Sequence, residues 1–438
     1  MNTVLGYFIK SALRHKNKIA VIHDGISITY NELHQRSLYY SELITDNNVK
    51  PGDRVAIFSK NSIDYIACYY GIWLSSAVAV PLNTDSKAKD IANWVKHADA
   101  KLIFMDKTIN ESDNVYQLVS EDCNIKYIDH EDERGYGKDI MLDEYTEPDI
   151  NSLASIIYTS GTTGQPKGVM LTHKNISSNM QSILSYLPIK DDDKFVNVLP
   201  FFYSYGNSVL HTHLMCGATI ILVNSLMFPN KVLETIDGYN ATSISGVPST
   251  FLLLLGKGSL ERYDLSSLKY LTQAGGPMAP STTKQIINKI PDVEIYIMYG
   301  QTEATARLSY LPPELIGDKM SSIGKPIPGV EFLLKKDNGE LADVGDEGVI
   351  HARGDNIMSG YWKDEMLTKS VICNGWLNTG DIARQDSDGL FYIVGRKTEM
   401  IKTAANRVSP KEIEEVLLTL PGVNEVAVVG VDDELLGQ

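Results

Sequence analysis

The sequence predicts an α/β protein: a large N-terminal domain of two α/β sheet subdomains plus a β-rich subdomain, followed by a partial, small α+β C-terminal domain. Three observations support this fold class. Strand-like and helix-like segments alternate up to about residue 130, and a second run of alternation follows residue 158. From about residue 321, short strands with closely spaced turns replace this pattern. The length of 438 residues also exceeds what one ordinary core accommodates.

The first run begins with a predicted hairpin at 18–29 and an amphipathic helix at 30–44. Thr29 is the expected N-cap of this helix, with Glu32 three residues later completing a capping box. Further apolar segments predict an apolar helix at 62–77 and strands at 54–60, 78–82, 101–106 and 124–130. This alternation predicts a largely parallel sheet covered by helices.

The second run continues the same pattern. It predicts a helix through 211–218 and strands at 194–202, 219–223 and 241–249, while 267–278 and 293–303 each pass from a strand into a polar or glycine-containing loop. Residues 329–354 alternate as short strands in the β-rich unit. Residues 399–438 predict a hairpin, a helix capped by Ser409 and Pro410, and one strand without a partner, so this last domain is expected to be incomplete.

Composition narrows the class of function. The net charge of −15 argues against a general nucleic-acid partner, because no continuous basic surface is expected. Four scattered cysteines fit a reducing compartment, and no apolar run is long enough to serve as a signal peptide or to span a bilayer. We therefore expect a cytoplasmic protein without a membrane span.

The segment YTSGTTGQPKG at 158–168 concentrates hydroxyl groups, glycines and one lysine behind a predicted strand. It does not satisfy the P-loop pattern, because Lys167 follows Pro166 and precedes Gly168 and a strand rather than opening a helix. Such a loop can instead surround phosphate oxygens with hydroxyl and amide donors. From these residues alone, a phosphate-binding loop and a Ser/Gly surface loop both remain open.

The wider pattern resembles the adenylate-forming superfamily, which includes acyl-CoA synthetases, luciferase-like enzymes and peptide-synthetase adenylation domains. The resemblance covers essentially the full chain and rests on motifs in the family's order, namely YTSGTTGQPKG, PFFYSYG, AGGPM, YGQTEA, GYW, GWLNTGD and GRKTEMIKTAANRVSPKEIEE. It implies ATP-dependent activation of a carboxylic acid as an acyl-adenylate with release of pyrophosphate. Transfer to a thiol, either CoA or the phosphopantetheine of a carrier protein, would follow.

The resemblance also implies roles for the residues of the motifs. The donors expected to hold the departing phosphates are Thr159, Ser160, Gly161, Thr162, Thr163, Gly164 and Lys167. Tyr299 offers an aromatic face for adenine, Thr302 a bond to the α-phosphate, and Glu303 a carboxylate for Mg²⁺, which prefers oxygen ligands.

Two further groups complete the expected nucleotide site. Gly275 and Gly276 would let the backbone approach the adenine ring, although a plain turn explains them equally well from the local sequence. Asp381 would accept from the ribose hydroxyls, and Arg396 would reach the ribose or phosphate. The resemblance divides the chain into 1–397, which binds ATP and the acid, and 398–438, a mobile C-terminal domain whose Lys402 enters the site in one of two states.

Four departures from the family pattern qualify these expectations. The hinge position carries Thr398 instead of Asp or Lys, Thr403 and two alanines replace a glycine-containing stretch, and Tyr203 stands where many acyl-CoA synthetases have histidine. The chain also stops before the family's C-terminal lysine. We therefore expect ATP binding with impaired adenylation.

The acid is expected to be uncharged apart from its reacting carboxylate. The segment after PFF contains no aspartate to hold an ammonium group, which favours a fatty or aryl acid. The expected pocket residues are Tyr203, Tyr205, Val247, Gly300 and Ala304. The alternatives are a free-standing amino-acid adenylation enzyme that loads a peptidyl carrier protein, or a non-catalytic nucleotide-binding module.

Two other features carry weaker signals. His211 and His213 lack a third ligand nearby, so core or surface positions are expected rather than a metal site. The three aspartates at 191–193 predict a solvated turn.

Overall fold

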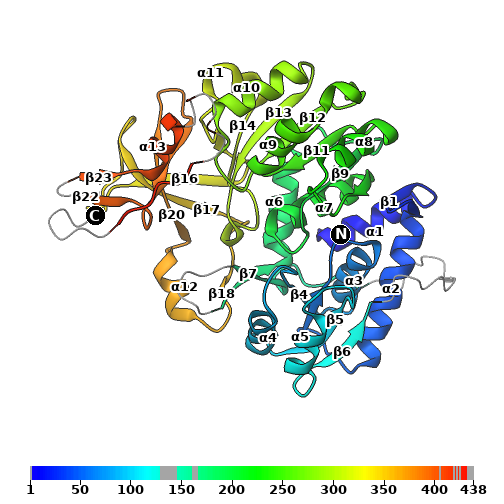
Figure 1. Cartoon of the computed structure of the whole chain (residues 1–438). Helices are drawn as coiled ribbons and strands as arrows, with labels where there is room; N and C mark the ends of the chain where they lie inside the picture. Colours follow the sequence, from blue (N-terminus) through cyan, green and yellow to red (C-terminus); the bar gives the residue numbers. More distant parts are fainter. Residues whose placement is uncertain are drawn as a thin grey trace.

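The structure is a computed structural model that describes residues 2–128, 146–159, 166–403, 406–417, 420, 423 and 426–431 (Figure 1). It confirms the predicted fold class, with two large mixed sheets, a smaller β-rich sheet and a small C-terminal unit. In Figure 1 the N-terminal half is blue and green, and the β-rich sheet and C-terminal unit are yellow to red.

The first large sheet has seven strands. In spatial order they are β18 (Gly360–Tyr361), β8 (Lys167–Thr172), β7 (Leu153–Thr159), β4 (Val78–Pro81), β3 (Arg54–Phe58), β5 (Ala100–Met105) and β6 (Asn124–Tyr127). The strands from β7 to β6 are parallel, as expected, whereas β8 and β18 add antiparallel pairs at one edge.

The second large sheet has nine strands. Their order is β15 (Lys325–Pro326), β14 (Ser309–Leu311), β13 (Glu294–Tyr299), β12 (Tyr270–Gln273), β11 (Ser243–Gly246), β9 (Lys194–Asn197), β10 (Thr219–Leu222), β1 (Ile19–His23) and β2 (Ile26–Thr29). The predicted N-terminal hairpin, β1 and β2, therefore joins this sheet and not the first one. The hairpin joins this sheet because β1 pairs in parallel with β10, with Val21 opposite Ile220. A hydrogen bond from Thr219 Oγ1 to the Ile19 carbonyl (2.7 Å) reinforces the pairing.

Helices cover both faces of each large sheet (Figure 1). Those between the sheets are α1 (Val4–Arg14), α2 (Tyr30–Asp46), α3 (Ile63–Leu74), α6 (His173–Leu184) and α7 (Ser204–Cys216). The outer ones are α4 (Ala88–His97) and α5 (Ser112–Val119) on the seven-stranded sheet, and α8 (Pro229–Tyr239), α9 (Pro248–Lys257) and α10 (Pro280–Lys289) on the nine-stranded sheet. The predicted capping box at the start of α2 is confirmed, since Thr29 and Glu32 exchange both hydrogen bonds.

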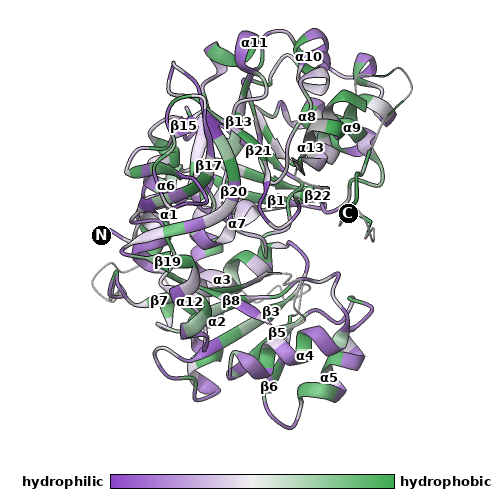
Figure 2. Cartoon of the chain, turned by 90° about the vertical axis from the view of Figure 1, so that its left-hand side faces the viewer, coloured by the Kyte–Doolittle hydropathy of each residue, from purple (hydrophilic) through white to green (hydrophobic). Residues whose placement is uncertain are grey.

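Side-chain alternation along the strands explains this layering. Val55 and Ile57 of β3 face the central core, which they share with Phe195 of the other sheet, whereas Ala56 and Phe58 face the core beneath α4 and α5. Figure 2 shows α4 and α5 with hydrophobic (green) and hydrophilic (purple) positions on the same helix, as expected for helices with one covered face.

The β-rich unit forms a five-stranded sheet, as predicted from residue 321 onward. It contains β16 (Val330–Lys335), β17 (Glu347–Gly354), β19 (Ile372–Cys373), β20 (Trp376–Gln385) and β21 (Phe391–Arg396). The shorter helical segments are α11 (Ile316–Lys319), α12 (Glu365–Val371) and the 3₁₀ turns Thr302–Ala304, Pro313–Leu315 and Leu260–Arg262. Leu260, Leu315 and Ile316 pack with the core of the nine-stranded sheet.

The C-terminal unit contains the predicted hairpin, β22 (Ile401–Thr403) with β23 (Asn406–Val408), and the predicted helix α13 (Pro410–Leu417). The predicted last strand is wrong for the part that is described, because residues 426–431 form no strand. Within the described part of this unit, Val428 N bonds to the Glu414 carboxylate at 2.9 Å and not to a neighbouring strand. A strand needs such a partner for its backbone groups.

The prediction of a solvated turn at 191–193 is also partly wrong. Asp193 is only 1% exposed, and its carboxylate accepts from Lys190 N (2.8 Å) and Lys269 Nζ (3.0 Å). The carboxylate closes the turn and pairs with a cation, which compensates for its burial.

No helix in the described ranges combines the length and apolar character that crossing a bilayer requires.

Candidate active site

Three of the predicted nucleotide-binding residues meet where β13 ends against the β20–β21 hairpin. The Tyr299 hydroxyl donates to Asp381 Oδ2 at 2.5 Å, and Arg396 Nε lies 3.7 Å from Asp381 Oδ1. Asp381 and Arg396 are register partners across β20 and β21, so backbone pairing sets their spacing. Burial raises the pKa of Asp381 and outweighs the opposing effects of Tyr299 and Arg396.

The segment that follows β13 folds back tightly on itself. A Cβ on Gly300 would lie 1.9 Å from the Ala306 carbonyl oxygen, so only glycine fits this approach. The fold-back places Thr302 beside the start of α7, where Thr302 Oγ1 and Ser204 Oγ lie 3.3 Å apart. Ala304, predicted to line the pocket, is fully buried within this segment.

Glu303 points toward β18. Its Oε1 atom accepts a hydrogen bond from the Tyr361 hydroxyl at 2.8 Å. Burial, and then the charge of Glu303, raise the pKa of Tyr361, so the phenol stays protonated and donates at neutral pH. Glu303 also contributes, as a minor cause, to the raised pKa of Asp381, which links it to the Tyr299–Asp381–Arg396 group.

The AGGPM segment lies against the start of α9. Gly275 has a φ of +83°, and a Cβ there would approach Val247 Cγ1 to 3.0 Å. The carbonyl of Gly276 accepts from Gln273 Nε2 at 2.7 Å. The structure thus brings Gly275, Gly276 and the predicted pocket residue Val247 together.

Thr159 and Lys167 face each other at the loop end of the β7–β8 hairpin, where they are register partners. Lys167 opens a strand and not a helix, which confirms that this loop is not a P-loop. The remaining predicted loop residues, Ser160, Gly161, Thr162, Thr163 and Gly164, lie outside the described residues.

The two tyrosines predicted for the acid pocket differ in exposure. Tyr203 is half exposed, at 50%, and its hydroxyl accepts from Asn83 Nδ2 at 3.2 Å. Tyr205 is buried, and its hydroxyl donates to the Thr272 carbonyl at 2.9 Å. The guanidinium carbon of Arg307 lies 4.2 Å from the centroid of the Tyr205 ring.

Lys402 lies in β22, opposite Arg407 in the register of β22 and β23. Its side chain lies outside the described part of the structure. Thr398, at the predicted hinge, lies in the turn between β21 and β22.

Comparison with known proteins identifies the family. The family model described as AMP-binding enzyme matches residues 8–362, and the model of its C-terminal domain matches residues 412–438. The chain belongs to the AMP-binding enzyme family. The predicted membership of the adenylate-forming superfamily is thereby confirmed.

Relatives of this AMP-binding enzyme include a 2-succinylbenzoate–CoA ligase of Bacillus cytotoxicus, 31% identical over 100% of this chain and 88% of the relative. The o-succinylbenzoate CoA synthetase (MenE) of Bacillus subtilis, solved with the acyl-adenylate OSB-AMP, is 26% identical, with a TM-score of 0.88 and coverage of 98% and 86%. An anthranilate CoA ligase, AuaEII, shares the fold at 22% identity, with a TM-score of 0.90 and coverage of 99% and 84%.

The residues of this AMP-binding enzyme fit Mg²⁺ and ATP. The structure of the Bacillus subtilis synthetase with ATP and a magnesium ion is 26% identical to this chain, with a TM-score of 0.86 and coverage of 98% and 87%. Here Glu303 would supply a carboxylate, one oxygen of which already accepts a hydrogen bond from Tyr361. Mg²⁺ is commonly held by one or two carboxylates plus substrate phosphates, so this donor set suits it.

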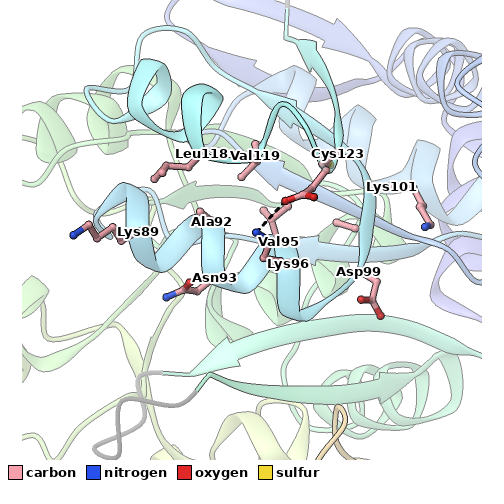
Figure 3. Close-up of a pocket in the computed structure, with 12 residues that line it drawn as sticks. Lys89, Ala92, Asn93, Val95, Lys96, Asp99, Lys101, Leu118, Val119 and Cys123 are labelled. Atoms are coloured by element: carbon pink, nitrogen blue, oxygen red, sulfur yellow. Dashed lines mark ion pairs between the residues drawn. The ribbon is translucent and has the colours of Figure 1, made fainter.

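Other features of the described residues lie apart from the predicted site. The cavity of about 410 Å³ between α4 and α5, shown in Figure 3, contains none of the predicted site residues, and Lys96 pairs with Asp122 at 3.0 Å beside it. No group of three metal-ligating side chains occurs among the residues that the structure describes. His211 and His213 are buried and bonded to Tyr70 and Tyr270, so of the two expected positions, core or surface, both histidines occupy the core.

Sequence reasoning missed two residues of the site, Tyr361 and Arg307. Tyr361 was visible as part of the GYW motif, but its partner Glu303 is 58 positions away in the chain. Arg307 had no local signal, since it follows YGQTEA within an apolar stretch.

Proposed function

We propose that this enzyme activates an aryl carboxylic acid with ATP, forming an acyl-adenylate and pyrophosphate, and then transfers the acyl group to CoA. The observation that carries this proposal is the Tyr299–Asp381–Arg396 group, which meets the Glu303–Tyr361 pair at the end of β13. The carboxyl ends of parallel strands are where ligands bind in such sheets. The relatives named as 2-succinylbenzoate–CoA ligases support the aryl class of acid.

The nucleoside half of ATP would lie along Tyr299. Asp381 would accept from the ribose hydroxyls through Oδ1, because Oδ2 already accepts from Tyr299. Arg396, 53% exposed, would add a positive charge on the solvent side. Gly275 and Gly276 would let the backbone approach adenine.

The triphosphate half would extend toward the β7–β8 hairpin. Thr302 would donate to the α-phosphate, and Glu303 would hold Mg²⁺, which neutralises charge on the phosphates. Thr159, Lys167 and the donors at 160–164 would hold the departing pyrophosphate. Catalysis by this chain's residues is then mainly positioning and charge stabilisation.

Arg307 supports an aryl acid over an amino acid. The residue is only 2% exposed, and its Nε donates to Met298 Sδ at 3.1 Å and not to a carboxylate. A guanidinium stays charged, so a substrate ammonium group near the Tyr205 ring would meet a buried like charge. An acid that bears no cation avoids this repulsion.

The domain boundary and the acceptor are part of the same proposal. We place the hinge at Thr398, so that residues 1–397 hold the substrates and residues 398–438 move, bringing Lys402 to the site in one state. CoA is the proposed acceptor, and a carrier-protein phosphopantetheine is the second candidate.

ATP–pyrophosphate exchange tests the proposal. We expect exchange with 2-succinylbenzoate or another aryl acid, and release of the acyl group onto CoA when it is added. Exchange driven only by an amino acid would refute the aryl assignment. ATP binding without exchange for any fatty, aryl or amino acid would identify a non-catalytic nucleotide-binding module.

A further inference from the structure

We propose that Tyr361 is a positioning residue that orients the Glu303 carboxylate toward Mg²⁺, and that β18 couples this carboxylate to the strand of Lys167. The proposal rests on the proposed function of Glu303 and Lys167. It gives the GYW motif a role in the geometry of the MgATP site.

The first observation is the contact itself. Tyr361 is 7% exposed, and its hydroxyl donates to Glu303 Oε1 at 2.8 Å. A phenol held in the core has little rotational freedom, so the bond fixes the direction of the carboxylate. Oε1 is engaged, which leaves Oε2 as the oxygen for a metal ion.

The second observation is the backbone ladder of β18. Gly360 and Tyr361 pair with Met170 and Val169 of β8, and Trp362 N donates to the Gly168 carbonyl at 2.7 Å. Lys167 directly precedes Gly168 on the same strand. The spacing between the carboxylate and this lysine is therefore set by one antiparallel ladder.

The third observation is strain in the segment after Glu303. Thr305 has φ 67° and ψ −60°, and Ala306 N donates to the Ala304 carbonyl at 2.7 Å. These features define a γ-turn of the rare, strained form. Such strain persists only where the surroundings enforce it, and it concentrates at functional sites.

The chain just before Tyr361 provides that enforcement. Thr305 Oγ1 donates to the Asn356 carbonyl at 2.7 Å, Asn356 Nδ2 donates to the Arg307 carbonyl at 2.9 Å, and Met358 N donates to the Glu303 carbonyl at 2.9 Å. Residues 356–361 thus hold Glu303 by its backbone and by its side chain. A residue that only fills the core would not need a hydrogen bond to this carboxylate.

Tyr361→Phe removes the hydroxyl and keeps the ring. The matched control is Tyr392→Phe, because the Tyr392 hydroxyl donates to Asp386 Oδ2 at 2.9 Å, away from the site. ATP affinity is measured by calorimetry for each variant with and without Mg²⁺, and folding is followed by thermal unfolding. For Tyr361→Phe we expect unchanged affinity for metal-free ATP and about tenfold weaker affinity for MgATP. Tyr392→Phe should bind both forms like the wild type.

A double-mutant cycle with Glu303→Gln gives a second measurement on the same bond. Once Glu303→Gln has removed the carboxylate, adding Tyr361→Phe should not weaken MgATP binding further. Equal loss of metal-free and MgATP affinity in Tyr361→Phe, or a wild-type response to Mg²⁺, overturns the positioning role and leaves the proposed function intact. A wild-type protein whose ATP affinity ignores Mg²⁺ would refute the proposed role of Glu303 and this inference with it.

Discussion

Replacing Asp381 by asparagine should separate ATP binding from stability. The side chain is 17% exposed, and in the proposed site it accepts from a ribose hydroxyl through Oδ1, since Oδ2 accepts from Tyr299. A hydrogen bond to a charged group contributes about 1.5–3 kcal/mol, so its loss should weaken ATP binding roughly ten- to 150-fold. Titration calorimetry with MgATP measures this change.

The free energy of unfolding of Asp381→Asn should not fall, although its ATP affinity does. Burial raises the pKa of Asp381, so the folded protein binds a proton at this carboxyl more readily than the unfolded chain does. The charged form therefore costs stability above the folded pKa, and this cost disappears as the pH falls through that pKa. Asp381→Asn removes the cost, so its free energy of unfolding at neutral pH should equal or exceed that of the wild type.

Asp386 in the same hairpin provides the matched control. Burial opposes its ionisation, but hydrogen bonds led by that from Lys319 Nζ outweigh it and lower the pKa from 3.8 to about 2. After screening by solvent, this shift corresponds to roughly 1 kcal/mol of stability at neutral pH, which is lost as the pH falls from about 4 to about 2. Asp386→Asn should lower the denaturant midpoint and leave ATP affinity unchanged. Loss of stability in Asp381→Asn, or wild-type ATP affinity, would refute this reasoning.

Three further predictions concern other parts of the molecule. Burial lowers the pKa of four buried histidines from 6.5, to about 4 for His34, His173 and His213 and to about 3 for His211. As the pH falls, the unfolded chain therefore takes up protons at these histidines before the folded protein does, and the free energy of unfolding should fall between about pH 6.5 and pH 4. Urea unfolding at pH 5 should show a loss of about 2 kcal/mol per histidine. Gly300→Ala would place a Cβ 1.9 Å from the Ala306 carbonyl oxygen. This clash should abolish ATP–pyrophosphate exchange and lower the free energy of unfolding by about 1–3 kcal/mol. Wild-type exchange in this variant would contradict the tight fold-back after β13. Arg307→Met should relax the bias against amino acids in the exchange assay without changing the Kd for ATP, and an unchanged acid profile would remove Arg307 from the specificity argument.

Local sequence patterns predicted the helices and strands themselves better than they predicted which strands lie side by side in a sheet. The capping residues Thr29 and Glu32 and the strand that begins at Lys167 depend on short-range chemistry. The pairing of hairpin β1–β2 with β10 joins residues about 200 positions apart, so the local pattern does not show which sheet the hairpin joins. Strand β18 has only two residues, too few for any periodicity to reveal.

The same distinction applies to the site. Most of the predicted nucleotide-binding residues lie at the end of a strand or close to a glycine, and these signals are local. Tyr361 and Arg307 depend on long-range contacts, with Glu303 and with Tyr205. Asp193 was predicted to be solvated because its partner Lys269 is remote in sequence.

Two tyrosine–carboxylate pairs join the three sheets at the proposed site. Tyr299 of the nine-stranded sheet donates to Asp381 of the five-stranded sheet, and Tyr361 of the seven-stranded sheet donates to Glu303 just beyond β13. Each pair therefore crosses a boundary between sheets, and each carboxylate is one that the proposed function assigns to ATP or Mg²⁺. A ligand that engages both carboxylates would fasten the three sheets to one another, so MgATP should raise the unfolding temperature more than ATP alone does. Because Asp381→Asn and Tyr361→Phe each weaken one of these connections, either change should reduce that increase, whereas Asp386→Asn should preserve it.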